Sequence, residues 1–310
     1  MTEFPVRVSA RRDEAEGVFS LELCAVAGRE LPSWTPGAHI DVAVGAAGVR
    51  QYSLCGDPAD RRHWRIAVLR EPEGRGGSEY LHLTAFPNTE LRISRPRNNF
   101  EFLVRDSYVF VAGGIGITPI LPMLAAAQAS DARWELYYGG RTRGHMAFAD
   151  EIARRYPWAR LLPQDEHGLL PLGDILAEHS DSAIYCCGPE PLLAAVETEG
   201  ARRNSDVHVE RFVPRPVASA ARGSFEVRLA SSGETFRVGA TQSIVDVLDA
   251  AGIEIITSCR EGTCGSCETA VLAGDIDHRD SVLTVEEQAR GDTMMLCVSR
   301  AGSEVLVLDL

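Results

Sequence analysis

The first hundred residues alternate between short apolar runs and turn residues. Pro36-Gly37 and Glu73-Gly74 are typical turn pairs. Between such turns, the apolar–polar alternation or apolar content of β-strands appears at residues 40–44, 65–69 and 90–94. Many short strands separated by turns predict an antiparallel β-barrel, which we assign to residues 1–103.

The pattern changes near residue 105, where apolar strands begin to alternate with helices. Strands are predicted at residues 108–112, 134–138, 159–162, 183–187 and 207–212. Helices are predicted between them, at residues 119–129, 146–156, 172–178 and 191–200. Apolar strands that alternate with helices indicate a parallel sheet covered on both faces. Residues 104–213 are therefore expected to form an α/β domain.

Residues 213–223 read VPRPVASAARG and have no amphipathic period, so we interpret residues 214–223 as a linker. A hairpin is predicted beyond it, at residues 225–229 and 235–238, and a helix at residues 243–251. These elements place a third domain at residues 224–310. Three domains are consistent with a chain of 310 residues.

The composition is that of an ordinary globular protein, with 45% apolar and 24% charged residues. No apolar run approaches the roughly 18–20 residues that a membrane span needs. The N-terminal residues Met1 to Pro5 lack the basic and then apolar order of a signal peptide. We therefore expect a soluble, cytoplasmic protein with no membrane contact.

The net charge of −13 argues against a nucleic-acid partner, because phosphate contacts need clustered cations. All 31 basic residues are arginine, which excludes the Schiff-base lysine of pyridoxal enzymes and the lysine of ATP-binding P-loops. Residues 224–310 contain 15 acidic residues and 6 arginines, so they carry −9 of the charge. Such an acidic domain favours docking to a positively charged protein surface, although solubility alone would also explain it.

The strongest chemical signal is the spacing of four of the eight cysteines, with four residues between Cys259 and Cys264 and two between Cys264 and Cys267. Cys297 follows after 29 residues. This is the plant-type spacing of a [2Fe–2S] cluster. Glycines within the loop let backbone N–H groups approach the cluster sulfurs. A structural zinc site is the alternative, but zinc ligands usually come as two short pairs.

A second signal lies in the predicted barrel. Arg50, Tyr52 and Ser53 are close together on one segment, and a glycine-rich turn ends at Ser78. The arginine and the backbone N–H groups of the turn suit a phosphate, the ring suits a flat heterocycle, and the hydroxyl suits its edge. Taken alone, an ordinary strand and a tight turn explain the same residues.

A third signal is the turn Gly113-Gly114-Ile115-Gly116-Ile117-Thr118-Pro119 between a strand and a helix. Such a turn suits a dinucleotide pyrophosphate, through free N–H groups and the helix dipole. We expect Thr118 to be the N-cap and Pro119 the first helical residue. The turn departs from G-x-G-x-x-G, since Pro119 replaces the third glycine, so a simple tight turn is the alternative.

A fourth signal is Cys186-Cys187-Gly188-Pro189 at the end of a later strand. Ligands bind at the carboxyl ends of parallel strands, which places Cys187 at the mouth of the crevice formed by the glycine turn. Cys186 is interpreted as a buried core thiol. The same structural role is assigned to Cys24 and Cys55.

The order of these motifs resembles the phthalate dioxygenase reductase family over essentially the whole chain. It runs RQYS, GGS, GGIGITP, CGPEPL, Glu210-Arg211-Phe212 and the cysteine loop. The resemblance implies an FMN-binding module like ferredoxin–NADP reductase, followed by a β-grasp [2Fe–2S] ferredoxin domain. Members of this family pass electrons from NADH to a partner oxygenase.

The resemblance also implies roles for individual residues. FMN would be bound by Arg50, Gln51, Tyr52, Ser53, Ala67, Val68, Leu69, Gly76, Gly77 and Ser78. The nicotinamide crevice would be lined by Gly114, Gly116, Thr118, Cys187 and Gly188, with Phe212 packed near the flavin. Ser53 and Cys187 would flank the path of the hydride, and Cys259, Cys264, Cys267 and Cys297 would bind iron. Leu69 is a departure, because some relatives have a basic residue there.

Together these inferences predict a monomeric NADH-dependent reductase with FMN and a [2Fe–2S] cluster. Its expected partner is a Rieske-type oxygenase that hydroxylates or O-demethylates its substrate. A reductase for a bacterial cytochrome P450 and a flavin and cluster redox sensor are the alternatives. FMN is preferred to FAD, since no segment is evident for the adenine half. Arg141 and Arg143 follow the second parallel strand and leave NADPH as an alternative to NADH.

Overall fold

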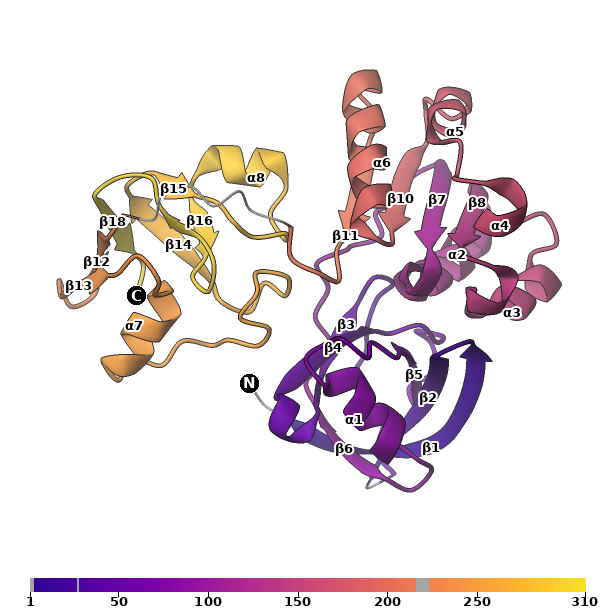
Figure 1. Cartoon of the computed structure of the whole chain (residues 1–310), viewed down its shortest axis with the longest axis horizontal. Coiled ribbons are helices and arrows are strands. Elements are labelled where there is room, and N and C mark those ends of the chain that lie inside the picture. Colours follow the sequence, from indigo (N-terminus) through magenta and orange to yellow (C-terminus); the bar gives the residue numbers. More distant parts are fainter. Residues whose placement is uncertain (1–2, 27, 216–222) are drawn as a thin grey trace. The chain divides into compact units, whose positions relative to one another are not determined.

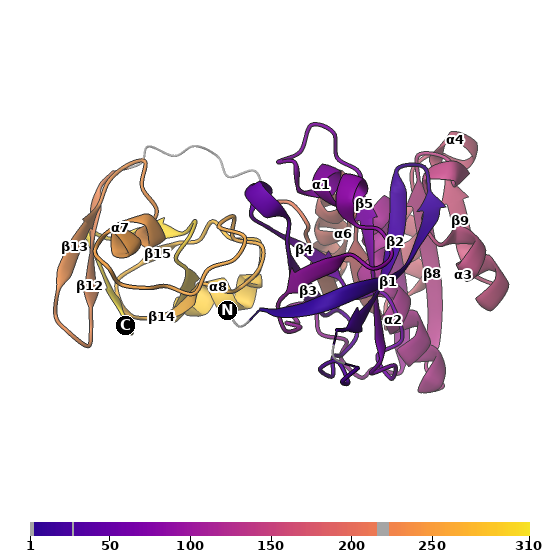
Figure 2. The same cartoon turned by 90° about the horizontal axis from the view of Figure 1, so that it is seen from below.

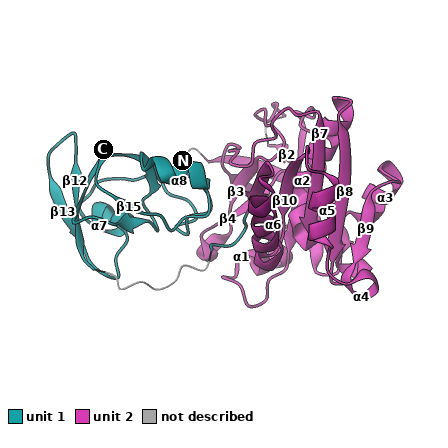
Figure 3. Ribbon diagram, turned by 90° about the horizontal axis from the view of Figure 1, so that it is seen from above, with its two compact units in different colours: residues 1, 211–310 teal, residues 2–210 magenta. Residues whose placement is uncertain are grey.

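The computed structural model describes residues 3–26, 28–215 and 223–310, so most of the predicted linker lies outside the described residues. The chain divides into two compact units, residues 2–210 and residues 211–310 (Figure 3). The first unit contains both the predicted barrel and the predicted α/β region. Among the described residues, no helix is long and apolar enough to cross a membrane.

Six antiparallel strands form the N-terminal sheet (Figure 1, Figure 2). They are β1 (Phe4–Ala15), β2 (Val18–Ala25), β3 (His39–Ala43), β4 (Val49–Ser53), β5 (His63–Leu69) and β6 (Glu90–Ile93). The strand order is β4-β3-β6-β1-β2-β5, and the two edge strands contact each other. The Cys55 amide also donates to the Arg65 carbonyl oxygen at 2.8 Å, so the sheet closes into a barrel.

Five parallel strands form the second sheet, in the order β11-β10-β7-β8-β9. They are β7 (Ser107–Gly113), β8 (Arg133–Gly140), β9 (Arg160–Pro163), β10 (Ala183–Cys187) and β11 (Val207–Glu210). The helices are α2 (Ile117–Ala129), α3 (Ala149–Arg155), α4 (Gln164–His167), α5 (Leu172–Glu178) and α6 (Glu190–Arg203), with 3-10 turns at Gly114–Gly116 and Arg143–His145. The predicted α/β architecture is confirmed.

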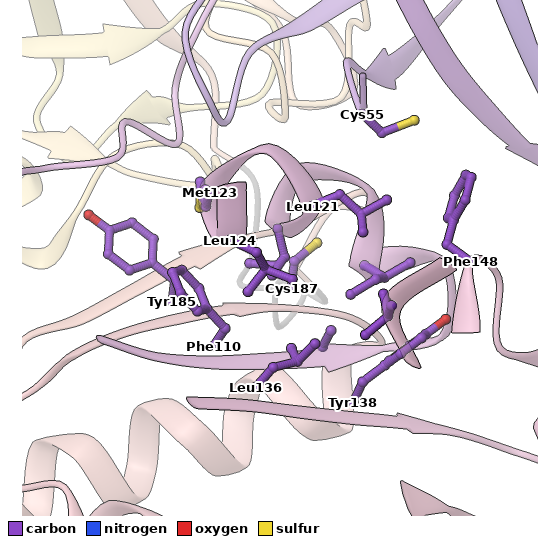
Figure 4. Packing of buried hydrophobic residues seen from close by; sticks show 14 of the residues in the cluster. Cys55, Phe110, Leu121, Met123, Leu124, Leu136, Tyr138, Phe148, Tyr185 and Cys187 are labelled. Carbon is purple, nitrogen blue, oxygen red and sulfur yellow. The ribbon is translucent and has the colours of Figure 1, made fainter. Parts of the chain in front are cut away.

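The two faces of the parallel sheet have separate cores, because side chains alternate along each strand. Tyr185 and Cys187 of β10 face the cluster that contains α2, whereas Ile184 and Cys186 face α5 and α6. Figure 4 shows Cys187 among Leu124 and other residues of the first cluster. The two adjacent cysteines therefore belong to different layers.

The barrel and the parallel sheet are joined by packing and by polar contacts. Val18, Cys55 and Ala67 of the barrel belong to the same buried cluster as α2 and β7. Arg65 of β5 forms a bidentate ion pair with Glu151 of α3, at 2.7 and 3.2 Å. The Glu16 amide donates to the Gly144 carbonyl oxygen at 2.8 Å. These contacts make residues 2–210 one compact unit.

The C-terminal unit contains a mixed five-stranded sheet in the order β13-β12-β18-β14-β16. Its elements are β12 (Phe225–Leu229), β13 (Thr235–Val238), α7 (Ile244–Ala250), β14 (Glu268–Ala273), β15 (Ile276–Asp277), α8 (Val285–Arg290), β16 (Thr293–Met295), β17 (Arg300–Ala301) and β18 (Val305–Leu308). β12 is parallel to β18, and α7 packs on β13, as in the β-grasp fold that was expected. A capping box between Ser243 and Asp246 begins α7.

Two local predictions were wrong. The helix expected at Pro119 begins at Ile117, because the 3-10 turn of Gly114–Gly116 leads directly into α2. Thr118 is therefore inside the helix, and its hydroxyl donates to the Ile115 carbonyl oxygen at 2.9 Å. The glycine-rich turn expected to end at Ser78 is instead the start of helix α1 (Gly77–Thr84).

Candidate functional site

Strand β4 presents a buried hydroxyl group that no atom of the described residues uses. Ser53 is 5% exposed, and its Oγ has no hydrogen-bond partner among the described residues. Its neighbour Tyr52 is largely buried, which raises the pKa of the phenol and keeps it neutral. Gln51 donates to Asp41 Oδ1 at 3.3 Å, so that side chain is already held. Ser53 is thus a buried polar group of this strand that can bind a ligand.

Arg50 and the start of α1 form a cradle beside this strand. The Arg50 guanidinium donates to the carbonyl oxygens of Ala47 and Val49 at 2.8 Å and of Arg75 at 3.0 Å. A Cβ atom at Gly77 would lie 2.5 Å from Arg50 Cγ, so only glycine permits this approach. The first N–H groups of a helix and an arginine are a suitable environment for a phosphate.

The predicted site residues of β5 have side chains on both sides of the barrel wall. Ala67 and Leu69 pack toward the cluster shared with the parallel sheet, whereas Val68 lies in the barrel core. Val68 can therefore offer a ligand only its backbone. The partnerless Ser53 hydroxyl, the Arg50 cradle and the outward-facing Ala67 and Leu69 together fit an FMN molecule.

The glycine turn after β7 is packed tightly against the end of β10. A Cβ atom at Gly116 would lie 2.3 Å from the Cys187 carbonyl oxygen and 2.6 Å from the Gly188 nitrogen. Gly114 has a φ of +54°, a conformation that favours glycine. The Tyr138 hydroxyl lies 3.0 Å from the carbonyl oxygens of Gly114 and Ala147 and helps to fix the turn. The structure therefore brings together the predicted glycines of both nicotinamide motifs.

Cys187 is fully buried and is paired in the sheet with Ala112 on one side and Glu210 on the other. Burial, and secondarily the nearby Glu210 carboxylate, raises the pKa of the Cys187 thiol well above its usual value. The thiol is therefore neutral at physiological pH. It belongs to the same buried cluster as Ala67 of the flavin-side barrel wall.

Glu210, at the end of β11, was not predicted as a site residue. Its Oε2 is buried without a hydrogen-bond partner among the described residues, although the residue as a whole is only partly buried. Burial raises the pKa of its carboxyl group to about 8. The signal in the sequence was its position in the Glu210-Arg211-Phe212 motif, which contributed only to the family resemblance. A carboxyl group that titrates near neutrality beside Cys187 is typical of a functional site.

Phe212 belongs to the other compact unit and is 42% exposed. Its packing near the flavin stays a prediction.

The cysteine loop between α7 and β14 wraps its backbone around the sulfur atoms. Cys259 Sγ accepts hydrogen bonds from the amides of Glu261 at 3.3 Å and Thr263 at 3.5 Å. Cys264 Sγ accepts one from the Ser266 amide at 3.4 Å. Gly262 and Gly265 have φ values of +71° and +70°, so the predicted glycines provide the turns that point these N–H groups inward.

All four cysteines are free thiols, and they lie close enough to influence one another's ionisation. Cys259 interacts with Cys264 and Cys297, and Cys267 interacts with Cys297. Hydrogen bonds from its two neighbours lower the pKa of Cys259, which favours its thiolate. Among the described residues, no three His, Cys, Asp or Glu side chains converge as ligands of one metal ion would. A group of four neighbouring thiols fits a [2Fe–2S] cluster, in which four thiolates serve two irons.

Comparison with known proteins accounts for both sets of features. Residues 110–198 match the oxidoreductase NAD-binding domain family, and residues 227–302 match the 2Fe-2S iron-sulfur cluster binding domain family. The chain is 38% identical to the phthalate 4,5-dioxygenase oxygenase reductase subunit of Pseudomonas putida, over 98% of this chain and 96% of that protein. It is 36% identical to the solved phthalate dioxygenase reductase, with a TM-score of 0.71, over 99% of this chain and 98% of that one.

The chain belongs to the phthalate dioxygenase reductase family. The predicted fold class, the [2Fe–2S] domain and the NAD-binding oxidoreductase domain are thereby confirmed. As a member of this family, the protein is an oxidoreductase that serves as the reductase component of a multicomponent oxygenase. A second solved structure, an intact type IV self-sufficient cytochrome P450 monooxygenase, matches 99% of the chain at 41% identity with a TM-score of 0.92. This chain spans 41% of that longer protein.

Proposed function

We propose that this reductase passes electrons from NADH through FMN and the [2Fe–2S] cluster to a Rieske-type oxygenase that hydroxylates or O-demethylates its substrate. The observation that carries the proposal is the buried, partnerless Ser53 hydroxyl in the unit that also contains the tight glycine turns around Cys187. NADH gives up two electrons together, whereas oxygenase iron accepts them singly. FMN, when bound, supplies the change from two-electron to one-electron transfer.

The residues of the chain position and insulate this chemistry. Arg50 and the α1 N-terminus would hold the FMN phosphate, and Ser53 would donate its hydroxyl hydrogen to the flavin. Gly114, Gly116 and Gly188 leave room for the pyridine nucleotide, and the neutral Cys187 thiol packs at the nicotinamide. Cys259, Cys264, Cys267 and Cys297 are the proposed iron ligands. Ser53 and Cys187 are the proposed catalytic residues.

Anaerobic stopped-flow mixing of the holoenzyme with NADH tests the order of transfer. We expect the flavin absorbance to bleach first and the cluster absorbance next. A purified Rieske-type oxygenase should then reoxidise both groups. Cluster reduction ahead of the flavin, or failure of every Rieske-type partner tried, would contradict the proposal.

The choice of cofactors can be tested separately. Flavin released by heat should run as FMN on a chromatogram, and an FAD peak would overturn that choice. Arg141 and Arg143 are the two cations that could bind the 2′-phosphate of NADPH. Arg143 is already paired with Asp150 at 2.8 Å, which supports NADH. We expect a higher kcat/KM with NADH than with NADPH in paired steady-state assays.

A cytochrome P450 is the second candidate partner, favoured by the match to the self-sufficient P450. Parallel assays of the reduced protein with a Rieske-type oxygenase and with a bacterial P450 distinguish the two. A redox sensor would show NADH reduction without fast turnover on ferricyanide. We further propose that the protein is a cytoplasmic monomer, for which light scattering of the purified holoenzyme tests the oligomeric state.

A further inference from the structure

A cavity of about 230 Å³ lies where the barrel meets the α/β layer, away from the glycine turns. It is formed by segments that are far apart in the sequence: the turn after β4, strand β5, helix α2 and the end of helix α3. Its lining residues are Cys55, Gly56, Asp57, Arg65, Leu121, Ala125, Glu151, Ile152, Arg155 and Tyr156.

Some of the residues that line the cavity already have hydrogen-bond partners within the protein. Arg65 donates to both carboxylate oxygens of Glu151 and, at 2.8 and 3.2 Å, to the Cys55 carbonyl oxygen. The Cys55 thiol is fully buried, and burial raises its pKa to about 12, so it is neutral and acts as an apolar surface. These residues form a closed wall and do not need a ligand.

Three other lining residues can contact a ligand: Tyr156 is buried, whereas Asp57 and Arg155 are exposed. Tyr156 is 4% exposed, and its hydroxyl has no partner among the described residues. The neighbouring Arg155 guanidinium lies 5.3 Å from the Tyr156 ring and pairs with no carboxylate in the described part of the chain. Asp57 accepts the Ala59 amide with one oxygen, at 2.9 Å, and retains the other. A buried hydroxyl without a partner is costly unless something binds to it.

We propose that this cavity binds a small hydroxylated aromatic carboxylate. Its carboxylate would accept hydrogen bonds from Arg155 and Tyr156, and its hydroxyl would donate to Asp57. The ring would pack on the aliphatic side chains of Leu121, Ala125 and Ile152. An apolar cavity of about 150 Å³ can hold benzene, so the larger volume here accommodates one ring with two polar substituents.

The position of the cavity gives such binding a consequence. The ligand would contact the barrel through Asp57 and the parallel-sheet layer through α2 and α3, so it would hold the two layers together. A hydroxyl group is also what the oxygenase named in the proposed function would introduce or uncover in its substrate. That link rests on the proposed function, whereas the binding itself does not.

Isothermal titration of the holoenzyme, without NADH or oxygenase, tests the inference with 4-hydroxybenzoate as the probe. We expect saturable binding of one molecule per chain. Benzoate lacks the hydroxyl group and phenol lacks the carboxylate, so each should bind about tenfold more weakly. Absence of saturable binding at concentrations up to about 10 mM would overturn the proposal.

Variants locate the site. Tyr156→Phe and Arg155→Gln should each weaken 4-hydroxybenzoate binding about tenfold. Arg154→Gln, at an equally exposed arginine that does not line the cavity, should leave it unchanged. Tyr156→Phe removes a hydroxyl without a partner among the described residues, so this variant should fold normally. Unchanged affinity in both lining variants would place the binding elsewhere and refute the site. The FMN spectrum should stay constant during each titration, and a spectral change would show that the probe enters the flavin crevice instead.

Discussion

The two compact units differ in how the protein contacts the atoms that we assign to their cofactors, although Ser258 Oγ beside Cys259 is also buried without a partner in the described structure. In residues 2–210, Ser53 Oγ and Glu210 Oε2 are buried without a partner in the described structure. In residues 211–310, the sulfur atoms of Cys259 and Cys264 already accept hydrogen bonds from backbone amides of their own loop. In the first arrangement a bound organic cofactor would supply the missing hydrogen bond to Ser53. In the second, the protein itself supplies hydrogen bonds to the sulfur atoms that would bind iron.

The largest effect that tests this contrast is expected for Cys267→Ser. A serine oxygen is a poorer ligand for iron than a thiolate, so the cluster should be lost or shifted in potential. We expect cytochrome c reduction to fall roughly 100-fold or more, because electrons would no longer pass from the flavin through the [2Fe–2S] cluster to this acceptor. Flavin bleaching by NADH should be nearly unchanged in stopped flow, because the crevice lies in the other unit.

Cys24→Ser is the matched control for this variant, since Cys24 is only partly buried and lies on β2, outside the proposed sites. It should retain both activities. Equal loss of flavin bleaching and cytochrome c reduction in Cys267→Ser would show that the two units do not act independently.

A large effect is also expected for Gly116→Ala. The added Cβ would meet the Cys187 carbonyl oxygen at 2.3 Å, so the turn must shift. We expect the free energy of unfolding to fall by about 1–3 kcal/mol and flavin reduction by NADH to slow at least about tenfold. Gly173→Ala is the control, because its Cβ would meet only the Glu199 side chain at 3.8 Å. Normal flavin reduction in Gly116→Ala would separate this turn from nucleotide binding.

Ser53→Ala is expected to slow reduction by NADH with little change in the free energy of unfolding. The hydroxyl has no partner in the described part of the chain, so its removal should change the free energy of unfolding of the flavin-free protein by less than about 0.5 kcal/mol. Loss of its hydrogen bond to the flavin should slow reduction by NADH about tenfold in stopped flow. A destabilised protein with an unchanged rate would mean that Ser53 is structural.

The change expected for Glu210→Gln is in the pH dependence of stability. The native pKa of Glu210 is about 8, above the ordinary 4.5 of the unfolded chain. The folded state therefore keeps a proton that the unfolded state loses, and stability decreases as pH rises from about 5 to 8. The slope due to this residue is at most about 1.4 kcal/mol per pH unit.

Glutamine does not titrate, so Glu210→Gln should lack this part of the slope in urea unfolding at pH 6, 7 and 8. The exposed Glu178→Gln should keep it. Parallel slopes in the wild type and Glu210→Gln would show that Glu210 is ionised in the native state.

The regular elements were the most predictable part of the fold. The bounds of β10, α5, β12 and β13 were predicted from hydrophobic pattern alone, because each is a clear run between turn residues. Helix α1 was missed because Gly76 and Gly77 at its start indicate a turn. The left-handed Gly76, with a φ of +81°, in fact leads directly into that helix.

The candidate site was predictable only where a motif is local. The cysteine loop and the glycine turn keep their residues within a few positions, so spacing alone indicated their chemistry. Glu210 meets Cys187 only through the pairing of β10 with β11, and the Arg65–Glu151 ion pair joins residues 86 positions apart. The cavity beside that pair likewise depends on the packing of distant segments, which no local pattern reveals.

The alternation of Cys186 and Cys187 provides a way to observe motion in the α/β layer. Both thiols are fully buried, yet one faces α5 and α6 and the other faces α2 and the barrel. A thiol reagent reaches each residue only when its own layer opens. Labelling rates of Cys186→Ala and Cys187→Ala, read by mass spectrometry of the 186–187 peptide, would therefore report the opening of the two sides separately. The labelling rates of two adjacent residues thus report separately on the opening of the two faces of one sheet.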